Sequence, residues 1–122
     1  MPPEGLRVND AQAAIHDEIV SLLAAPEQGT NSPSLAYLED TLTAGYARAL
    51  ELEGERLRVE RQIGEVTSRL GDEADPDRAE ELAALAERAS QADGDLRRLR
   101  RVLASLHARA SALRAAGAVI VF

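Results

Sequence analysis

The chain has 122 residues, a formal net charge of −7 and no cysteine, so disulfide bonds and thiolate chemistry are excluded. Two histidines are too few for the usual zinc sites, and the negative charge opposes general binding to the phosphate backbone of nucleic acids. Hydrophobic residues make up 45% of the chain but aromatic residues only 2%, so Leu, Ala, Val and Ile must fill any core. Such a core suits helices that pack closely side by side.

The sequence lacks an apolar run near the roughly 18 residues that span a bilayer, and its first ten residues lack the order of a signal peptide. We therefore expect a cytoplasmic protein that does not associate with a membrane.

A first helix is expected at about residues 9–25. Asn9 or Asp10 can serve as its N-cap, and four apolar residues then recur on one face. Pro26 and Gly29 should end this helix. The four apolar residues are Ile15, Ile19, Leu22 and Leu23.

Heptad repeats predict two longer helices, at about residues 34–70 and 76–116. Between them, Gly71 is a good residue to follow a helix, and Asp75 with Pro76 is a good pair to begin one. The a and d positions of the second helix are Leu35, Leu38, Leu42, Gly45, Ala49, Leu52, Arg56, Val59, Ile63, Val66 and Leu70. Those of the third are Leu82, Leu85, Ala89, Ala92, Leu96, Leu99, Leu103, Leu106, Ala110 and Leu113.

Two long helices joined by a short loop must fold back on each other antiparallel. If the residue numbers of facing residues sum to 148, as for Val66 and Leu82, the two helices form ten layers, and each layer pairs an a position with a d position. Small residues then meet larger ones, as for Gly45 and Leu103, which close packing requires. We therefore predict an all-α fold, a long antiparallel coiled-coil helical hairpin with the first helix packed on its open end as a three-helix bundle. The prediction treats residues 1–122 as a single domain.

Apolar residues outside the seam mark two candidate interfaces. Tyr46, Leu50 and Leu57 form a stripe on the second helix, and we expect this stripe to join two copies into a homodimer. An apolar tail at residues 117–122 should follow a helix stop at Gly117. Its apolar side chains, which could dock on the bundle, on the mate or on a partner protein, are Val119, Ile120, Val121 and Phe122.

Arg56 occupies an a position inside the seam, where acids from both long helices can meet its charge. A polar residue in one core layer commonly fixes register and oligomeric state, and we assign Arg56 this register-setting role. A hinge or an ion site at this level is the alternative, because Gly54 and Gly94 also sum to 148 and weaken both helices.

The loop between the long helices carries an acidic tip made of Asp72, Glu73, Asp75 and Asp77. In architecture, an antiparallel coiled coil with an acidic tip resembles the Gre-type transcription factors, which push such a tip into RNA polymerase and hold a magnesium ion there. The resemblance implies a regulator of the transcription machinery. The simpler interpretation is that these acids cap and favour the N-terminus of the third helix.

The segment 15–19, Ile-His-Asp-Glu-Ile, resembles the His-acid box in the dimerisation and phosphotransfer helices of histidine kinases. The resemblance implies a phosphotransfer or regulatory helical bundle that acts through His16, with the following acid helping to activate it. The simpler interpretation is an ordinary surface histidine. The second histidine, His107, is expected to pair with Glu39 beside the seam.

The sequence contains no nucleophile and base pair, no Gly-rich phosphate loop and no metal-ligand spacing, so we expect neither catalysis nor a cofactor. We predict a non-enzymatic coiled-coil interaction or assembly protein, a homodimer that presents helical surfaces to an unidentified partner protein. The alternatives are the phosphotransfer bundle that acts through His16 and the transcription regulator that acts through the acidic tip.

Overall fold

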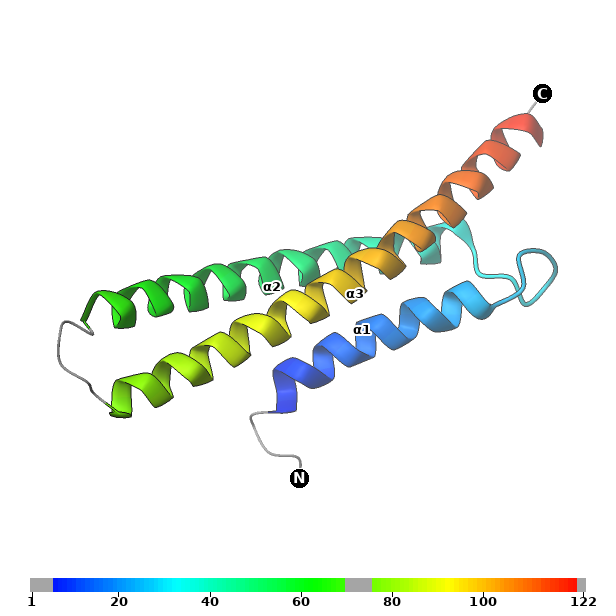
Figure 1. The fold of residues 1–122 in the computed structure, drawn as a ribbon. Coiled ribbons are helices and arrows are strands. Elements are labelled where there is room, and N and C mark those ends of the chain that lie inside the picture. The colour runs from blue at the N-terminus through cyan, green and yellow to red at the C-terminus, as the bar shows by residue number, and fades with distance from the viewer. Residues whose placement is uncertain (1–5, 70–75, 121–122) are drawn as a thin grey trace. The chain divides into compact units, whose positions relative to one another are not determined.

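The computed structural model describes residues 6–69 and 76–120 of the chain, with side chains for residues 14–69 and 76–117. Within the described residues the fold is all-α, with α1 at Leu6–Ala24, α2 at Leu35–Arg69 and α3 at Pro76–Ile120 (Figure 1). The helices α2 and α3 pack along each other as a hairpin, and α1 packs on them. The predicted fold class, an all-α three-helix bundle, is confirmed.

The helices α1 and α2 do not begin at the residues that the sequence pattern predicts. The helix α1 begins at Leu6 rather than Asn9, because no helix-breaking residue lies between Leu6 and Asn9 in the sequence. The helix α2 begins at Leu35, two residues after Pro33. Ser34 is the N-cap, since its hydroxyl oxygen accepts a 3.1 Å hydrogen bond from the Tyr37 backbone N–H.

The predicted end of the third helix is wrong. The helix α3 continues through Gly117 to Ile120, so residues 117–120 belong to the helix rather than to a tail. A glycine ends a helix when it adopts the left-handed conformation, and among the described residues only Gly29, in the loop after α1, has a positive φ angle. Gly117 therefore keeps helical geometry, at a cost of about 1 kcal/mol relative to alanine.

The chain divides into two compact units. The three-helix unit comprises Met1–Arg48 and Arg98–Phe122, and the two-helix unit comprises Ala49–Arg97. The helices α2 and α3 run through both units, and α1 belongs to the first alone. The prediction of a single domain stays a prediction.

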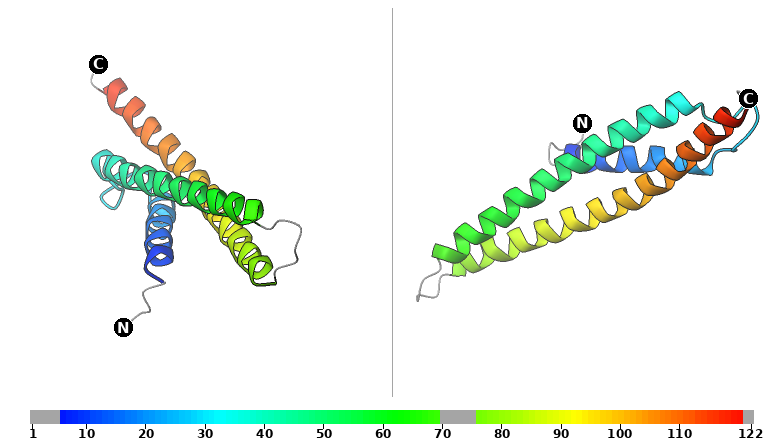
Figure 2. Two further views of the ribbon diagram at one scale, coloured as in Figure 1. Left: turned by 90° about the vertical axis from the view of Figure 1, so that its left-hand side faces the viewer. Right: turned by 90° about the horizontal axis from the view of Figure 1, so that it is seen from above.

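The core of the three-helix unit is formed where α1 lies beside the first part of α2 and the last part of α3 (Figure 2). Ile19 of α1 is completely buried in it, together with leucines of the two longer helices. Thr41 is the buried polar residue here, and its hydroxyl donates a 3.0 Å hydrogen bond to the Tyr37 carbonyl oxygen. The fully buried residues of this core from α2 and α3 are Leu38, Leu99, Leu106 and Ala110, with Leu103 at 2% exposure.

Gly45 lies where the three helices of this unit meet. A Cβ atom placed on Gly45 would overlap a terminal methyl group of Leu103 and would lie 3.4 Å from Cδ1 of Ile19. The contact joins the two residues that the predicted register sets opposite each other. It also shows why this position carries no side chain, because the backbone of α2 approaches both neighbouring helices too closely to leave room for one.

The two-helix unit has its own apolar seam between α2 and α3. Val59, Val66 and Leu85 are buried in it, and three partly buried residues pack against them. The three are Ile63, Leu82 and Ala89, which the predicted register pairs with Leu85, Val66 and Val59 in turn. The antiparallel layers follow the sequence pattern here, and the finer coiled-coil geometry stays a prediction.

Candidate interaction surface

Two leucines of the two-helix unit leave most of their side chains exposed to solvent. Leu50 is 68% exposed and Leu57 is 54% exposed, whereas the seam residue Leu52 between them is 3% exposed. Seven residues of an α-helix make almost two full turns, so Leu50 and Leu57 lie on the same outer face of α2. This face is the part of the predicted apolar stripe that falls in the two-helix unit.

Tyr46, the third member of the predicted stripe, belongs to the three-helix unit, where its side chain is 45% exposed. Two further large apolar side chains of that unit, Val20 and Tyr37, are exposed to a similar extent. The sequence pattern had not marked these two, because Val20 and Tyr37 each stand alone rather than in a helical repeat.

Charged residues flank the two exposed leucines. Glu51 and Arg58 each follow one of them directly in the sequence, and both are exposed. Gly54 lies halfway along the same stretch of α2, and the Arg58 Nη1 atom is 3.5 Å from the place that a Cβ atom on Gly54 would take. The Arg58 side chain therefore covers Gly54, and Glu53 lies on the other side of the line that joins the two leucines.

Arg56 makes its ion pairs within the two-helix unit. Its Nη1 atom donates a 3.3 Å hydrogen bond to Oδ1 of Asp93, and its Nε atom lies 3.7 Å from Oε1 of Glu60. Asp93 is shared, since its second oxygen accepts a 2.7 Å hydrogen bond from Arg97. The side chain of Arg56 is 32% exposed, so the charge is met by two acids and by water. The register-setting role of Arg56 stays a prediction.

Arg109 of α3 has a structural role that the sequence pattern did not reveal. Its guanidinium group reaches the end of α1 and donates four hydrogen bonds to backbone carbonyl oxygens. Carbonyls at the end of a helix lack partners within the helix and carry a partial negative charge, which a cation stabilises. The acceptors are the carbonyl oxygens of Leu22 at 2.6 Å, Leu23 at 3.0 Å, Ala25 at 2.8 Å and Pro26 at 2.8 Å.

Two more side-chain contacts tie the three-helix unit together. The Tyr37 hydroxyl donates a 2.7 Å hydrogen bond to Oε1 of Glu18, and this hydrogen bond, with the negative charge of Glu18, raises the pKa of Tyr37 above 10.0. Glu39 accepts a 3.0 Å hydrogen bond from Nε of Arg114. Glu39 was expected to pair with His107, which lies one heptad before Arg114 on the same flank of α3, but in the structure its ion pair is with Arg114.

His16 and its following acid are neighbours in space as well as in sequence. The Nδ1 atom of His16 lies 3.6 Å from Oδ1 of Asp17, and the His16 side chain is 30% exposed. The phosphotransfer role of His16 stays a prediction.

Most of the acidic tip and of the apolar tail lies outside the described part of the chain. Asp72, Glu73 and Asp75 are outside the described residues, and Asp77 lies in the first turn of α3, where an acid is favoured. Val121 and Phe122 are also outside, and of Val119 and Ile120 only the helical backbone is described. The expectation that the tail leaves the helix at Gly117 is wrong for residues 117–120.

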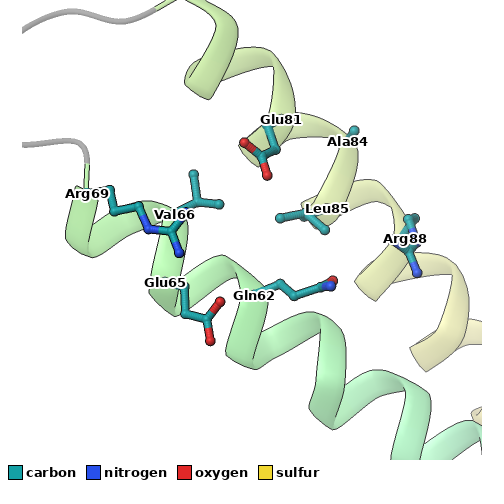
Figure 3. A pocket seen from close by; sticks show the side chains of 8 residues that line it. All are labelled: Gln62, Glu65, Val66, Arg69, Glu81, Ala84, Leu85 and Arg88. Carbon is teal, nitrogen blue, oxygen red and sulfur yellow. The ribbon is translucent and has the colours of Figure 1, made fainter.

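An open groove of about 400 Å³ runs along the seam of the two-helix unit (Figure 3). Val66 and Leu85 lie in its floor and point toward each other between the helices. They are only 5% and 7% exposed, so the groove offers little apolar surface to a ligand. Its other lining residues are Gln62, Glu65, Arg69, Glu81, Ala84 and Arg88.

Among the residues that the structure describes, no group of three or more His, Asp or Glu side chains is placed to hold a metal ion. Over the same residues, no helix combines the length and the apolar character needed to cross a membrane. Comparisons with protein-family models, with curated proteins and with solved structures give no match to this chain.

Proposed function

We propose that this chain is a non-enzymatic helical interaction or assembly protein, which forms a homodimer and presents its helices to a partner protein in the cytoplasm. The observation that carries the proposal is the exposure of Leu50 and Leu57 on one face of α2. Helical spacing predicts that Tyr46, four residues before Leu50, extends this face. Stretches of apolar surface on the outside of a helical hairpin are typical of protein interfaces.

The energetic argument rests on the area that a dimer removes from water. Full burial of one leucine side chain is worth about 1.5–3 kcal/mol, and Leu50 and Leu57 start 68% and 54% exposed. In a symmetric dimer each leucine is buried twice, once on each copy, so four such side chains contribute. A dimer of this kind leaves the charged surfaces of both copies available to a partner protein.

Sedimentation equilibrium tests the proposal on the full chain and on the variant Leu57→Glu. We expect a dimer for the full chain and a monomer for the variant, because two glutamates would be buried at the interface. Val20→Glu is the matched control, since Val20 is also an exposed apolar residue on a helix, at 44%, and it belongs to α1 rather than α2. A monomeric full chain would disprove the homodimer.

A chain that ends at Gly117 tests the contribution of the apolar residues after it. If it remains a dimer, the self-association does not depend on residues 118–122, and those residues are free to bind the partner protein. If only the truncated chain is a monomer, the interface lies at the C-terminus and not on the face of Leu50 and Leu57.

A further inference from the structure

We infer that α1 is a helical lid, which detaches from α2 and α3 while the two-helix unit stays folded, and that Arg109 makes the contact that holds this lid closed. When the lid opens, α2 is uncovered at Gly45, where the closed protein has the Ile19 side chain. Every contact of the closed lid lies in the three-helix unit. The opening does not require the homodimer proposed above.

The apolar attachment of α1 is small. Among the side chains of α1 that the structure describes, at residues 14–24, Ile19 alone is buried and four others are half-buried. The four are Ile15, His16, Leu22 and Leu23. Every other buried apolar side chain in the described part of the chain belongs to α2 or α3. Most of the stability of a helix in a protein comes from the packing of its apolar face, so α1 should detach at a lower free energy than the one that separates α2 from α3.

Arg109 adds a polar attachment at one end of the lid. Its guanidinium group donates four hydrogen bonds, of 2.6 to 3.0 Å, to the carbonyl oxygens of residues 22, 23, 25 and 26. All four acceptors lie at the end of α1 or in the loop that follows it, so these bonds stabilise the closed lid alone. A further hydrogen bond, from the Tyr37 hydroxyl to Glu18, lies at the surface, where water competes for both groups.

The loop at residues 25–34 lets α1 move without moving α2. Gly29 in this loop has a φ angle of 100°, and its Cβ position has no atom within 4 Å, so the loop is unpacked at this point. A few loop residues that change their backbone angles are enough to form a hinge, and glycine changes them most readily. Beneath the lid, the Cδ1 atom of Ile19 lies 3.4 Å from the Cβ position of Gly45. Opening therefore exposes an apolar place on α2 that the closed lid covers.

Native-state amide hydrogen exchange, followed by NMR on the full chain in low concentrations of urea, measures the opening. Amides of α1 near Ile19 should exchange at a lower free energy than the slowest amides of α2 and α3. Their exchange should also depend less on urea, because opening the lid exposes less surface than unfolding the whole protein. An equal urea dependence for all three helices would overturn the inference, since α1 would then open only when the protein unfolds.

Two substitutions in different units separate lid opening from unfolding. Arg109→Ala should accelerate exchange of the α1 amides by about 30-fold, because it removes charged hydrogen bonds that only the closed lid makes. Val59→Ala is the matched substitution, since Val59 is 1% exposed in the seam of the two-helix unit, which stays packed when α1 detaches. It should accelerate exchange in that seam and leave the α1 amides unchanged. Accelerated exchange of α1 in Val59→Ala would overturn the inference.

Two further arginine variants test whether Arg109 holds the lid closed. Arg109→Lys keeps the charge with fewer hydrogen bonds and should give a smaller acceleration than Arg109→Ala, and it replaces that variant in the comparison if Arg109→Ala does not fold. Arg101→Ala, at an exposed arginine of the same helix, should leave the exchange of α1 unchanged. Unchanged exchange of α1 in the Arg109 variants would show that Arg109 does not hold the lid.

Discussion

The Nη1 atom of Arg109, in α3, donates a 2.6 Å hydrogen bond to the carbonyl oxygen of Leu22, near the end of α1. Because the same guanidinium group also reaches the carbonyls of Leu23, Ala25 and Pro26, one side chain satisfies the end of α1 and the first residues of the following loop. The contact joins parts of the chain that are 83 to 87 residues apart in sequence.

Arg109→Ala should lower the free energy of unfolding by about 2 kcal/mol, the usual size for hydrogen bonds to a charged group and for a cation at a partly buried helix end. Arg109→Lys should recover part of the loss, because an ammonium group keeps the charge but cannot reach four acceptors at once. Urea denaturation followed by circular dichroism measures both changes. Arg101→Ala is the control, since Arg101 is an exposed arginine of the same helix, and an equal loss there would refute the proposed role of Arg109.

Gly45→Ala should destabilise the protein by about 1–3 kcal/mol, the usual cost of overpacking a core, because the new methyl group would collide with Leu103. This loss of stability is opposite to the usual effect of the substitution, since replacing glycine by alanine inside a helix normally stabilises a protein by about 1 kcal/mol. Gly64→Ala on the same helix is the matched control, because nothing lies within 4 Å of its Cβ position and stability should rise.

A double-mutant cycle identifies Leu103 as the cause of that collision. The cost of Gly45→Ala should shrink when Leu103→Ala is already present, so the two losses should be less than additive. Additive losses would place the strain somewhere other than at the Leu103 side chain.

Arg56→Leu should raise the free energy of unfolding by about 1 kcal/mol, because apolar residues in place of partly buried ion pairs are often stabilising and Leu would face the buried Ala92. If Arg56 sets the register, the same variant should populate more than one pairing of α2 with α3, visible as doubled amide signals in an NMR spectrum. Arg88→Leu, at an exposed arginine of the same two-helix unit, should give neither effect. A single set of signals for Arg56→Leu would remove the register-setting role.

Tyr37 should make stability depend on pH only in alkaline solution. Its pKa is raised in the folded state by the hydrogen bond to Glu18, so the protonated phenol favours folding. The contribution is complete below the unfolded value of about 10 and is lost as the pH rises through the folded value. The chain contains neither lysine nor cysteine, so the tyrosines are its only side chains with an ordinary pKa near 10.

Ultraviolet absorbance of the tyrosinate ion, followed in a Tyr46→Phe background, reports the titration of Tyr37 alone. Glu18→Ala should return its pKa to about 10, and Tyr37→Phe should abolish the alkaline loss of stability. An unchanged titration curve for Glu18→Ala would show that the contact with Glu18 does not control the phenol.

The architecture could be read from the sequence because its causes are local and repetitive. Leucine and alanine recur every three to four residues along both long helices, and such a pattern buries one stripe on each. Small residues such as Gly45 then allow few alternatives to the pairing with Leu103 that the structure contains. The exposure of Leu50 and Leu57 follows from the same pattern, since both fall outside the buried stripe.

The contacts of the longer polar side chains could not be predicted in this way. Arg109 acts on a helix end that is remote in sequence, and no local pattern marks the acceptor carbonyls. Glu39 could meet either His107 or Arg114, which lie two turns apart on one flank of α3, and only the packing of the helices decides between them. The continuation of α3 past Gly117 likewise depends on the backbone conformation of Gly117. A glycine can adopt helical and left-handed conformations about equally well, so the sequence alone does not decide between them.

The two units differ in how far apart in sequence their contacts lie, and this difference has a consequence for the order of folding. The two-helix unit is one continuous stretch, Ala49–Arg97. The three-helix unit brings together two separate stretches, and its contact between Arg109 and Leu22 joins residues 87 positions apart. Contacts between residues close in sequence form faster than remote ones, so on refolding the two-helix unit should form before the end of α1 is satisfied.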